Sequence, residues 1–156
     1  MDNVEIERKF LIDKFPDMLP LLESAEVWQG YISTEPVVRI RKKVTKSGES
    51  YRLCFKGAGG LVRTEVEMPL PAEKYAALLP LLGAPPVHKV FRVYALPGGE
   101  RLECSLVDGQ YYYAEVEFST VDAANAFSPP AFLGAEKTND PAFTMSHYWQ
   151  TRKFPV

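Results

Sequence analysis

The feature that most constrains the fold of this sequence is a strict alternation of charged and apolar residues, which begins in its first strand-like segment. In residues 4–10, the side chains of Glu5, Glu7 and Lys9 fall on one face of an extended strand. Two carboxylates on one face disfavour each other's ionisation unless a cation lies between them. Carboxylate oxygens are ligands of hard divalent ions, so this face suggests a metal ion, with Lys9 as a fixed charge for a neighbouring anion.

The alternation recurs in strands that we expect over residues 37–44, 51–56, 61–70, 87–96, 101–107 and 111–119. One more strand is expected over 26–33, a short helix or turn over 16–24, and helices over 71–82, 120–127 and 145–152. The fold class is therefore α+β, mainly β. The charged faces of the strands carry Glu5, Glu7, Lys9, Arg39, Arg41, Lys56, Arg63, Glu65, Glu67, Lys89, Glu103, Glu115 and Glu117.

Two structures explain such faces. An antiparallel sheet with one solvated side gives the same alternation. The alternative is a barrel of hairpin-linked strands whose apolar face points outward and whose charged face lines a tunnel. The residue types favour the barrel, because the charged faces hold few of the Ser, Thr and Gln residues of an ordinary wet surface. Acids and bases also segregate by strand, so they pair across strands.

A tunnel that carries both kinds of charge suits a metal-bound polyphosphate. Arginine binds phosphate oxygens in bidentate fashion and lysine binds them as a point charge. Glutamates hold Mg²⁺ or Mn²⁺, which bridges phosphates, and a second ion can activate a water for in-line attack. Cross-strand salt bridges among the same residues are the competing interpretation.

Composition limits the remaining classes. The 156 residues are expected to form a single domain, 1–156, and the net charge of −2 argues against a broadly basic surface for duplex nucleic acid. With two cysteines (Cys54 and Cys104) and two histidines, a zinc site is not expected. We find no signal peptide and no apolar run of about 20 residues, so we expect a cytoplasmic protein without membrane contacts.

Residues 5–9, Glu-Ile-Glu-Arg-Lys, resemble the ExExK signature of the CYTH superfamily, the triphosphate tunnel metalloenzymes. The resemblance continues in order through residues 29–31, 38–41, 55–57, 63–67, Lys89, Glu103, 114–118 and 134–138. It implies a closed eight-stranded antiparallel β-barrel, the tunnel, with a few short helices packed outside. It also implies divalent-metal-dependent hydrolysis of a small triphosphate, and the compact bacterial inorganic triphosphatases are the most similar members in length and spacing.

The resemblance also implies roles for single residues. The triphosphate would be gripped by Lys9, Arg39, Arg41, Lys56 and Lys89, with Arg63 and Tyr31 in support. One Mg²⁺ or Mn²⁺ would be held by Glu5, Glu7 and Glu117, and a second ion or its water by Glu65, Glu67 and Glu115. The catalytic residues would be Lys9, Glu65 and Glu67.

The chain departs from the family pattern at two positions. Members usually carry a basic residue at the position of Phe91, and many carry an acid at the position of Ser105. Losing one cation and one acid together leaves the net charge of the site unchanged, and we expect it to weaken either metal or phosphate binding.

Three functions stay open at this point. The first is hydrolysis of inorganic tripolyphosphate, or else of nucleoside or thiamine triphosphate. The second is a class IV-type adenylyl cyclase, and the third is a non-catalytic module that binds polyphosphate or nucleotide. The expected partner is a small-molecule triphosphate, and the assembly considered is a homodimer.

Overall fold

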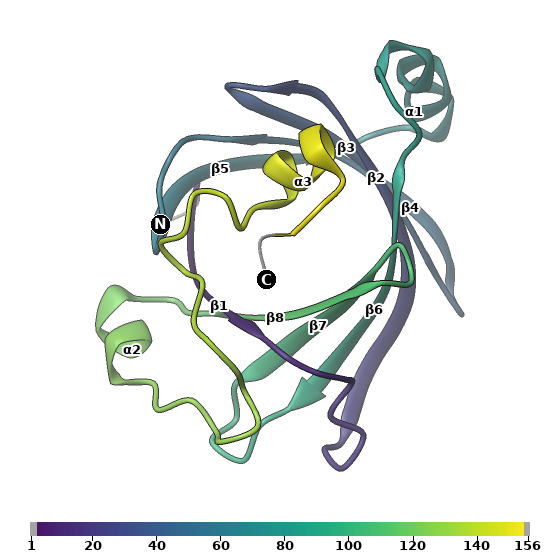
Figure 1. Ribbon diagram of the computed structural model, residues 1–156. Helices are drawn as coiled ribbons and strands as arrows, with labels where there is room; N and C mark the ends of the chain where they lie inside the picture. The colour runs from purple at the N-terminus through teal and green to yellow at the C-terminus, as the bar shows by residue number, and fades with distance from the viewer. Residues whose placement is uncertain (1–2, 155–156) are drawn as a thin grey trace.

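Eight antiparallel strands close into a barrel in the computed structural model, which describes residues 3–154 (Figure 1). Around the barrel the strands follow the order β1-β5-β4-β3-β2-β6-β7-β8. Their bounds are β1 Val4–Leu11, β2 Leu21–Thr34, β3 Val37–Thr45, β4 Gly48–Lys56, β5 Val62–Pro69, β6 Val87–Ala95, β7 Arg101–Val107 and β8 Tyr111–Glu117. The predicted closed barrel is confirmed.

The barrel closes through strands that are far apart in the sequence. The first part of β1 pairs with β5, where Glu5 lies opposite Arg63, and its second part pairs with β8, where Lys9 lies opposite Glu115. On the other side, β2 pairs with β6. Because each strand alternates, closure turns the charged faces inward and the apolar faces outward.

Most of the hydrophobic core therefore lies outside the barrel wall. One cluster, which includes Phe10, Leu102 and Val116, packs beneath the segment that carries α2 (Val121–Ala126). Helix α2 starts at the predicted N-cap, where the Thr120 hydroxyl accepts a hydrogen bond of 3.0 Å from the amide of Ala123.

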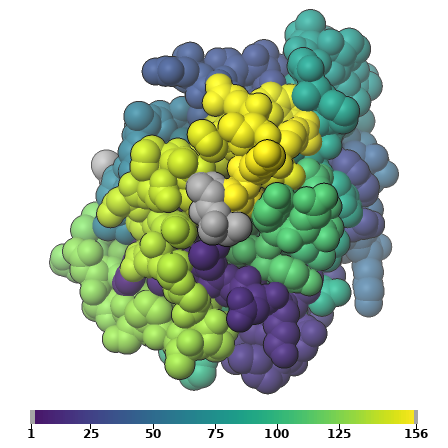
Figure 2. All heavy atoms as spheres, viewed as in Figure 1, coloured from purple at the N-terminus to yellow at the C-terminus, as the bar shows by residue number. Residues whose placement is uncertain are grey.

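A second apolar cluster closes one end of the barrel. It joins Val87, Val107 and Tyr113 of the wall to Phe143, Tyr148 and Phe154 of the C-terminal segment. Helix α3 (Met145–Thr151) lies across this end in Figure 1, and in Figure 2 its atoms and those of the preceding segment cover the same face.

The structure differs from the sequence expectations in two elements. Residues 17–19 form a turn, but residues 21–24 belong to β2 rather than to a short helix, because Leu21 and Glu23 pair with β6. The helix expected over 71–82 is divided into α1 (Ala72–Leu78) and a 3₁₀ turn (Leu79–Leu81), since Pro80 cannot donate an amide hydrogen bond to an α-helix. No helix in the described part of the chain is long and apolar enough to cross a membrane.

Candidate active site in the barrel interior

The charged strand faces line one cavity with a volume of about 270 Å³. Every site residue expected from the sequence contributes to its lining: Glu5, Glu7, Lys9, Tyr31, Arg39, Arg41, Lys56, Arg63, Glu65, Glu67, Lys89, Glu115 and Glu117. The alternative of a solvated outer face is therefore wrong for these residues, and they meet inside an enclosed, charged chamber.

Three carboxylates gather at one place in this chamber. One oxygen each from Glu5, Glu7 and Glu117 can be chosen so that all lie within 4.8 Å of one another. Burial and the neighbouring Glu115 raise the pKa of Glu7 well above its ordinary value, and burial and Glu5 raise the pKa of Glu117 to about 7. Such a cluster is stabilised by added positive charge, and its hard oxygen donors fit a divalent cation.

The carboxylates of Glu7 and Glu115 are neighbours, and each shifts the pKa of the other. Burial opposes ionisation of both, but a hydrogen bond from Glu7 and the nearby ammonium of Lys9 keep the pKa of Glu115 below its ordinary value. The two pKa shifts are therefore opposite in direction, raised for Glu7 and lowered for Glu115.

The expected cross-strand salt bridges form at only some of these acids. Lys56 Nζ lies 3.1 Å from both carboxylate oxygens of Glu5 and 3.5 Å from Glu65. Glu7 and Glu117 have no ion-pair partner within residues 3–154. A purely structural salt-bridge network therefore does not explain the cluster.

Two arginines on β3 face the chamber with incomplete hydrogen bonding. Arg39 lies 3.6 Å from Glu67, and Arg41 makes a hydrogen bond of 3.4 Å to the Gln29 side chain. The Nε atoms of both arginines are buried and have no partner among the described residues. Burial and the charge of Arg39 lower the pKa of Arg41. Buried guanidinium groups with unpaired Nε atoms indicate an anion-binding site.

The lysines complete the cationic side. Lys89 is buried and donates a hydrogen bond of 2.8 Å to the Tyr113 hydroxyl, and burial together with Arg41 lowers its pKa well below the usual range. Lys9 donates a hydrogen bond of 3.1 Å to the backbone carbonyl of Phe143. Lys9 thus connects the chamber to the segment that closes one end of the barrel.

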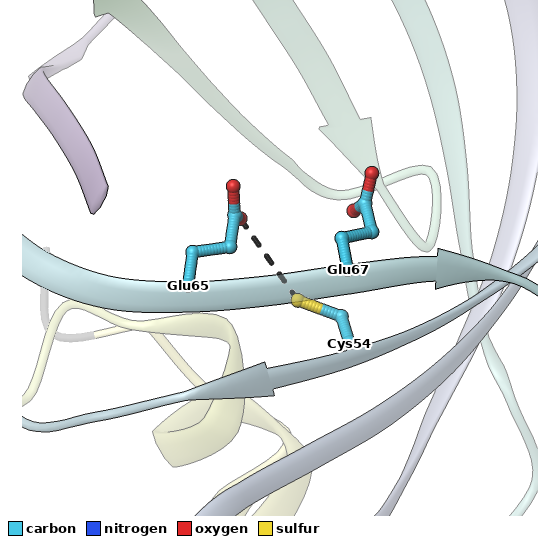
Figure 3. A group of neighbouring side chains, drawn as sticks. All are labelled: Cys54, Glu65 and Glu67. Carbon is cyan, nitrogen blue, oxygen red and sulfur yellow. Dashed lines mark hydrogen bonds between the residues drawn. The ribbon is translucent and has the colours of Figure 1, made fainter. Parts of the chain in front are cut away.

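Figure 3 shows a second group of possible metal ligands, with Cys54 on β4 turned toward Glu65 on β5 and Glu67 farther along that strand. The Cys54 thiol donates to Glu65 over 3.9 Å, and Arg52 Nε lies 2.6 Å from Glu67. Unlike Glu7 and Glu117, both carboxylates of this group are already paired with cations. The sequence did not predict Cys54 as a member of this group, because its position opposite Glu67 appears only in the strand register.

Tyr31 and Arg63, which were expected to support the phosphate grip, have different surroundings. Tyr31 is buried, accepts a hydrogen bond of 3.2 Å from Gln29 and lies 5.7 Å from Trp149 of α3, measured between rings. Arg63 donates to the Gly57 carbonyl over 3.1 Å.

The sequence did not lead us to predict Tyr113 as a site residue, although its place two residues before Glu115 puts it on the same inward face.

The two departures from the family pattern are neighbours in space. Phe91 on β6 lies directly opposite Ser105 on β7, and both line the cavity. The missing cation and the missing acid are thus one cross-strand pair.

Comparisons with known proteins agree with this geometry. The chain is 36% identical over 139 residues to an inorganic triphosphatase of Nitrosomonas europaea, covering 87% of this chain and 90% of that protein. It is 30% identical to the crystal structure of the inorganic triphosphatase NE1496, with a TM-score of 0.65 and 97% of each chain covered. A putative adenylyl cyclase from Hippeastrum, described as having a dominant triphosphatase activity, shares the fold at 14% identity and a TM-score of 0.50, over 78% of this chain and 82% of its own. No family model matches the chain.

Proposed function

The chain belongs to the CYTH superfamily of triphosphate tunnel enzymes, and from that premise we propose that it hydrolyses a small triphosphate, inorganic tripolyphosphate before nucleoside or thiamine triphosphate. One observation carries the proposal. Two carboxylates of the cluster that have no ion-pair partner among the described residues (Glu7 and Glu117) and two arginines with unpaired Nε atoms (Arg39 and Arg41) line the same cavity. A chain of phosphates with its metal ion satisfies both at once.

The carboxylates of Glu5, Glu7 and Glu117 would hold Mg²⁺ or Mn²⁺, either of which accepts hard oxygen ligands. When bound, the ion supplies positive charge to the phosphate oxygens and to the leaving group. The pKa of Glu117, raised to about 7, supports this assignment, because a cation would restore full ionisation near neutral pH.

The cations of the opposite strands would orient the substrate. Arg39 and Arg41 present guanidinium groups to phosphate oxygens, and Lys9, Lys56 and Lys89 add ammonium groups from three other strands. Arg63 and Tyr31 support this grip from the chamber wall. Phosphoryl transfer depends mainly on such positioning and charge stabilisation, so no covalent nucleophile is required.

Water would then be positioned by the acids of β5. Lys56 and the other nearby groups keep the pKa of Glu65 below its ordinary value despite burial, so its carboxylate is charged and accepts hydrogen bonds. We assign to Glu65, Glu67 and Glu115 the role of holding a second ion or the attacking water. We assign to Lys9 the role of stabilising the negative charge that develops on the phosphate. From inorganic tripolyphosphate, the products are orthophosphate and pyrophosphate.

The cyclase and binding-only alternatives are weaker. An adenylyl cyclase needs a pocket for the base and a group that deprotonates the ribose 3′-hydroxyl, and no sequence feature calls for either. The 36% identity to an inorganic triphosphatase favours turnover over binding alone.

The test is phosphate release from tripolyphosphate, ATP and thiamine triphosphate with Mg²⁺ or Mn²⁺, with Glu5→Gln as the control variant. Orthophosphate with a shorter phosphate chain supports hydrolysis, whereas cyclic AMP with pyrophosphate supports the cyclase. Binding without turnover supports the module. Unchanged release in Glu5→Gln would rule out the metal role of this cluster.

We also propose a cytoplasmic location and a homodimer. Both cysteines are free, which suits a reducing compartment. The outer face of β4 and β5 exposes Phe55 (39%), Val62 (43%) and Met68 (38%), an apolar strip that a second copy of the chain would cover. Sedimentation equilibrium with Met68→Glu tests the dimer.

A further inference from the structure

Residues 134–138 of the C-terminal segment lie along the part of β1 that β5 does not reach (Figure 1). Strand β5 pairs with the first half of β1, whereas β8 pairs with its second half. Beyond β5, Phe10 forms an antiparallel bridge with Glu136. The C-terminal segment therefore completes the barrel wall beside Lys9.

This segment holds Lys9 at three points. The Lys9 amide donates a hydrogen bond of 3.1 Å to the Thr138 hydroxyl, and the Lys9 carbonyl accepts one of 2.8 Å from the Lys137 amide. The Lys9 ammonium donates to the Phe143 carbonyl over 3.1 Å. Lys9 and Thr138 are buried, with 8% and 7% exposure. The place of the ammonium in the chamber therefore depends on residues 137–143.

The Thr138 hydroxyl is itself oriented by Glu136. It donates a hydrogen bond of 2.6 Å to the Glu136 carboxylate, which also accepts bonds of 2.7 and 2.8 Å from the Arg8 guanidinium. These bonds from Arg8 keep the pKa of Glu136 below its ordinary value, so the carboxylate is charged and only accepts. The hydroxyl proton therefore points to Glu136, and a lone pair is left for the Lys9 amide.

Arg8 anchors this arrangement to the end of α2. Its guanidinium donates to the carbonyls of Ala124 and Phe127 over 2.9 and 2.8 Å. The side chains of Arg8, Glu136 and Thr138 do not belong to the lining of the cavity. They can affect a reaction inside the chamber only through the residue that they hold.

We infer that Thr138, backed by Glu136 and Arg8, is a positioning residue whose hydroxyl holds β1 so that the Lys9 ammonium meets the reacting phosphate. The inference rests on the proposed function, in which Lys9 stabilises the charge that develops there. A displacement of about 1 Å at such a group can cost about 100-fold in rate. Because the charge develops in the transition state, misplacement of the ammonium should lower kcat more than it raises KM.

The first experiment removes the Thr138 hydroxyl and keeps the shape of the side chain. Thr138→Val should lower kcat for tripolyphosphate about tenfold and change KM less than about twofold, and Thr138→Ser, which restores the hydroxyl, should recover most of kcat. Thr120→Val is the matched control, because the Thr120 hydroxyl also accepts a backbone amide, over 3.0 Å, at the start of α2. Both valine variants should lower the melting temperature by about 3 °C, and only Thr138→Val should lower kcat.

A double-mutant cycle then separates positioning from a general loss of structure. In a Lys9→Met background, Thr138→Val should lower the remaining kcat less than about twofold, because the group that it positions is absent. The same tenfold loss in both backgrounds would overturn the inference. Glu136→Gln, which weakens the support from the surface, should lower kcat about threefold and repeats the cycle if Thr138→Val does not fold.

A measurement without turnover keeps the inference separate from the proposed function. The nitrogen NMR signal of the Lys9 ammonium, assigned by its loss in Lys9→Met, should move in metal-free Thr138→Val and stay in place in Thr120→Val. An unmoved signal in Thr138→Val would overturn the inference. Failure of the proposed function gives a different result, because the wild-type chain would then release no phosphate from any of the three triphosphates.

Discussion

Glu7 and Glu117 lie directly opposite each other on β1 and β8, and both carboxylates face the same cavity. Burial and the neighbouring carboxylates of Glu5 and Glu115 raise the pKa of both residues, so ionising either one in the folded chain is unfavourable. The described chain supplies no ion-pair partner for either residue, and a bound cation would offset this cost. The requirement for metal and the stability of the metal-free protein are therefore linked through this pair.

Glu117→Gln should change activity and metal-free stability in opposite directions. Loss of a proposed metal ligand should lower metal-dependent phosphate release at least about 100-fold, while loss of the repulsion with Glu5 should raise the melting temperature in EDTA. Thermal denaturation and phosphate release measure the two effects. Glu73→Gln, an exposed position on α1, should change neither. A fall in the EDTA melting temperature of Glu117→Gln would contradict the assignment.

The stability of the metal-free protein should fall as pH rises. Burial raises the pKa of Glu103 to about 8 and that of Glu117 to about 7, from an ordinary value of 4.5. Above pH 4.5 the unfolded chain has released these protons while the folded chain retains them, so the free energy of unfolding decreases up to about pH 8. Urea unfolding in EDTA across this range measures the decrease. Saturating Mg²⁺ should remove the part due to Glu117, and a flat profile in EDTA would contradict the prediction.

The sequence predicted the inward residues well because the period of a strand is two. Once Glu5 is placed inside, Glu7 and Lys9 must follow, and the same holds for Arg39 and Arg41. The closure of the barrel could not be derived in this way and came from the family resemblance. Pairing of β1 with both β5 and β8 depends on contacts between segments more than 50 residues apart, such as Glu5 with Arg63.

The residues that sequence reasoning missed depend on the same long-range register. Glu23 fell in a segment expected to be a helix or turn, because Pro16 and Pro20 mark a break, yet pairing with β6 makes it part of β2. The role of Tyr113 depends on the hydrogen bond that its hydroxyl accepts from Lys89, and the role of Phe143 depends on the hydrogen bond that its carbonyl accepts from Lys9. Local pattern gives the face of a residue, whereas its partner depends on the closed barrel.

Lys56→Met should weaken both the fold and substrate binding. The Lys56 ammonium bridges Glu5 and Glu65, and its side chain is only 12% exposed. Removing one partner of a buried ion pair costs about 3 kcal/mol, so the free energy of unfolding in EDTA should fall by that amount. The KM for tripolyphosphate should rise at least about tenfold. Chemical denaturation and steady-state kinetics test the two parts. An unchanged KM would exclude Lys56 from the phosphate grip.

Phe143→Ala should loosen the closed end of the barrel. Its ring is 1% exposed and stacks on Phe154 with ring centres 4.7 Å apart. Truncation of a buried phenylalanine costs about 3 kcal/mol, and here the loss should be concentrated in the C-terminal segment. Hydrogen exchange of the α3 amides should accelerate more than that of the β3 amides. Equal acceleration in both elements would show that the segment and the barrel unfold as one unit.

The opposed pair Phe91 and Ser105 allows a double-mutant cycle. Ser105 is 2% exposed, so Ser105→Asp alone would bury an unpaired charge beside other acids and should destabilise the protein by about 3 kcal/mol. Adding Phe91→Arg places a cation directly opposite and should recover at least about 1 kcal/mol, measured by urea unfolding. Ser105→Asp combined with Leu81→Arg, at an exposed position in the 3₁₀ turn, makes the same change of charge without the contact and should recover nothing. Equal recovery in the two double variants would mean that net charge, and not the cross-strand pairing, controls the stability of this part of the barrel.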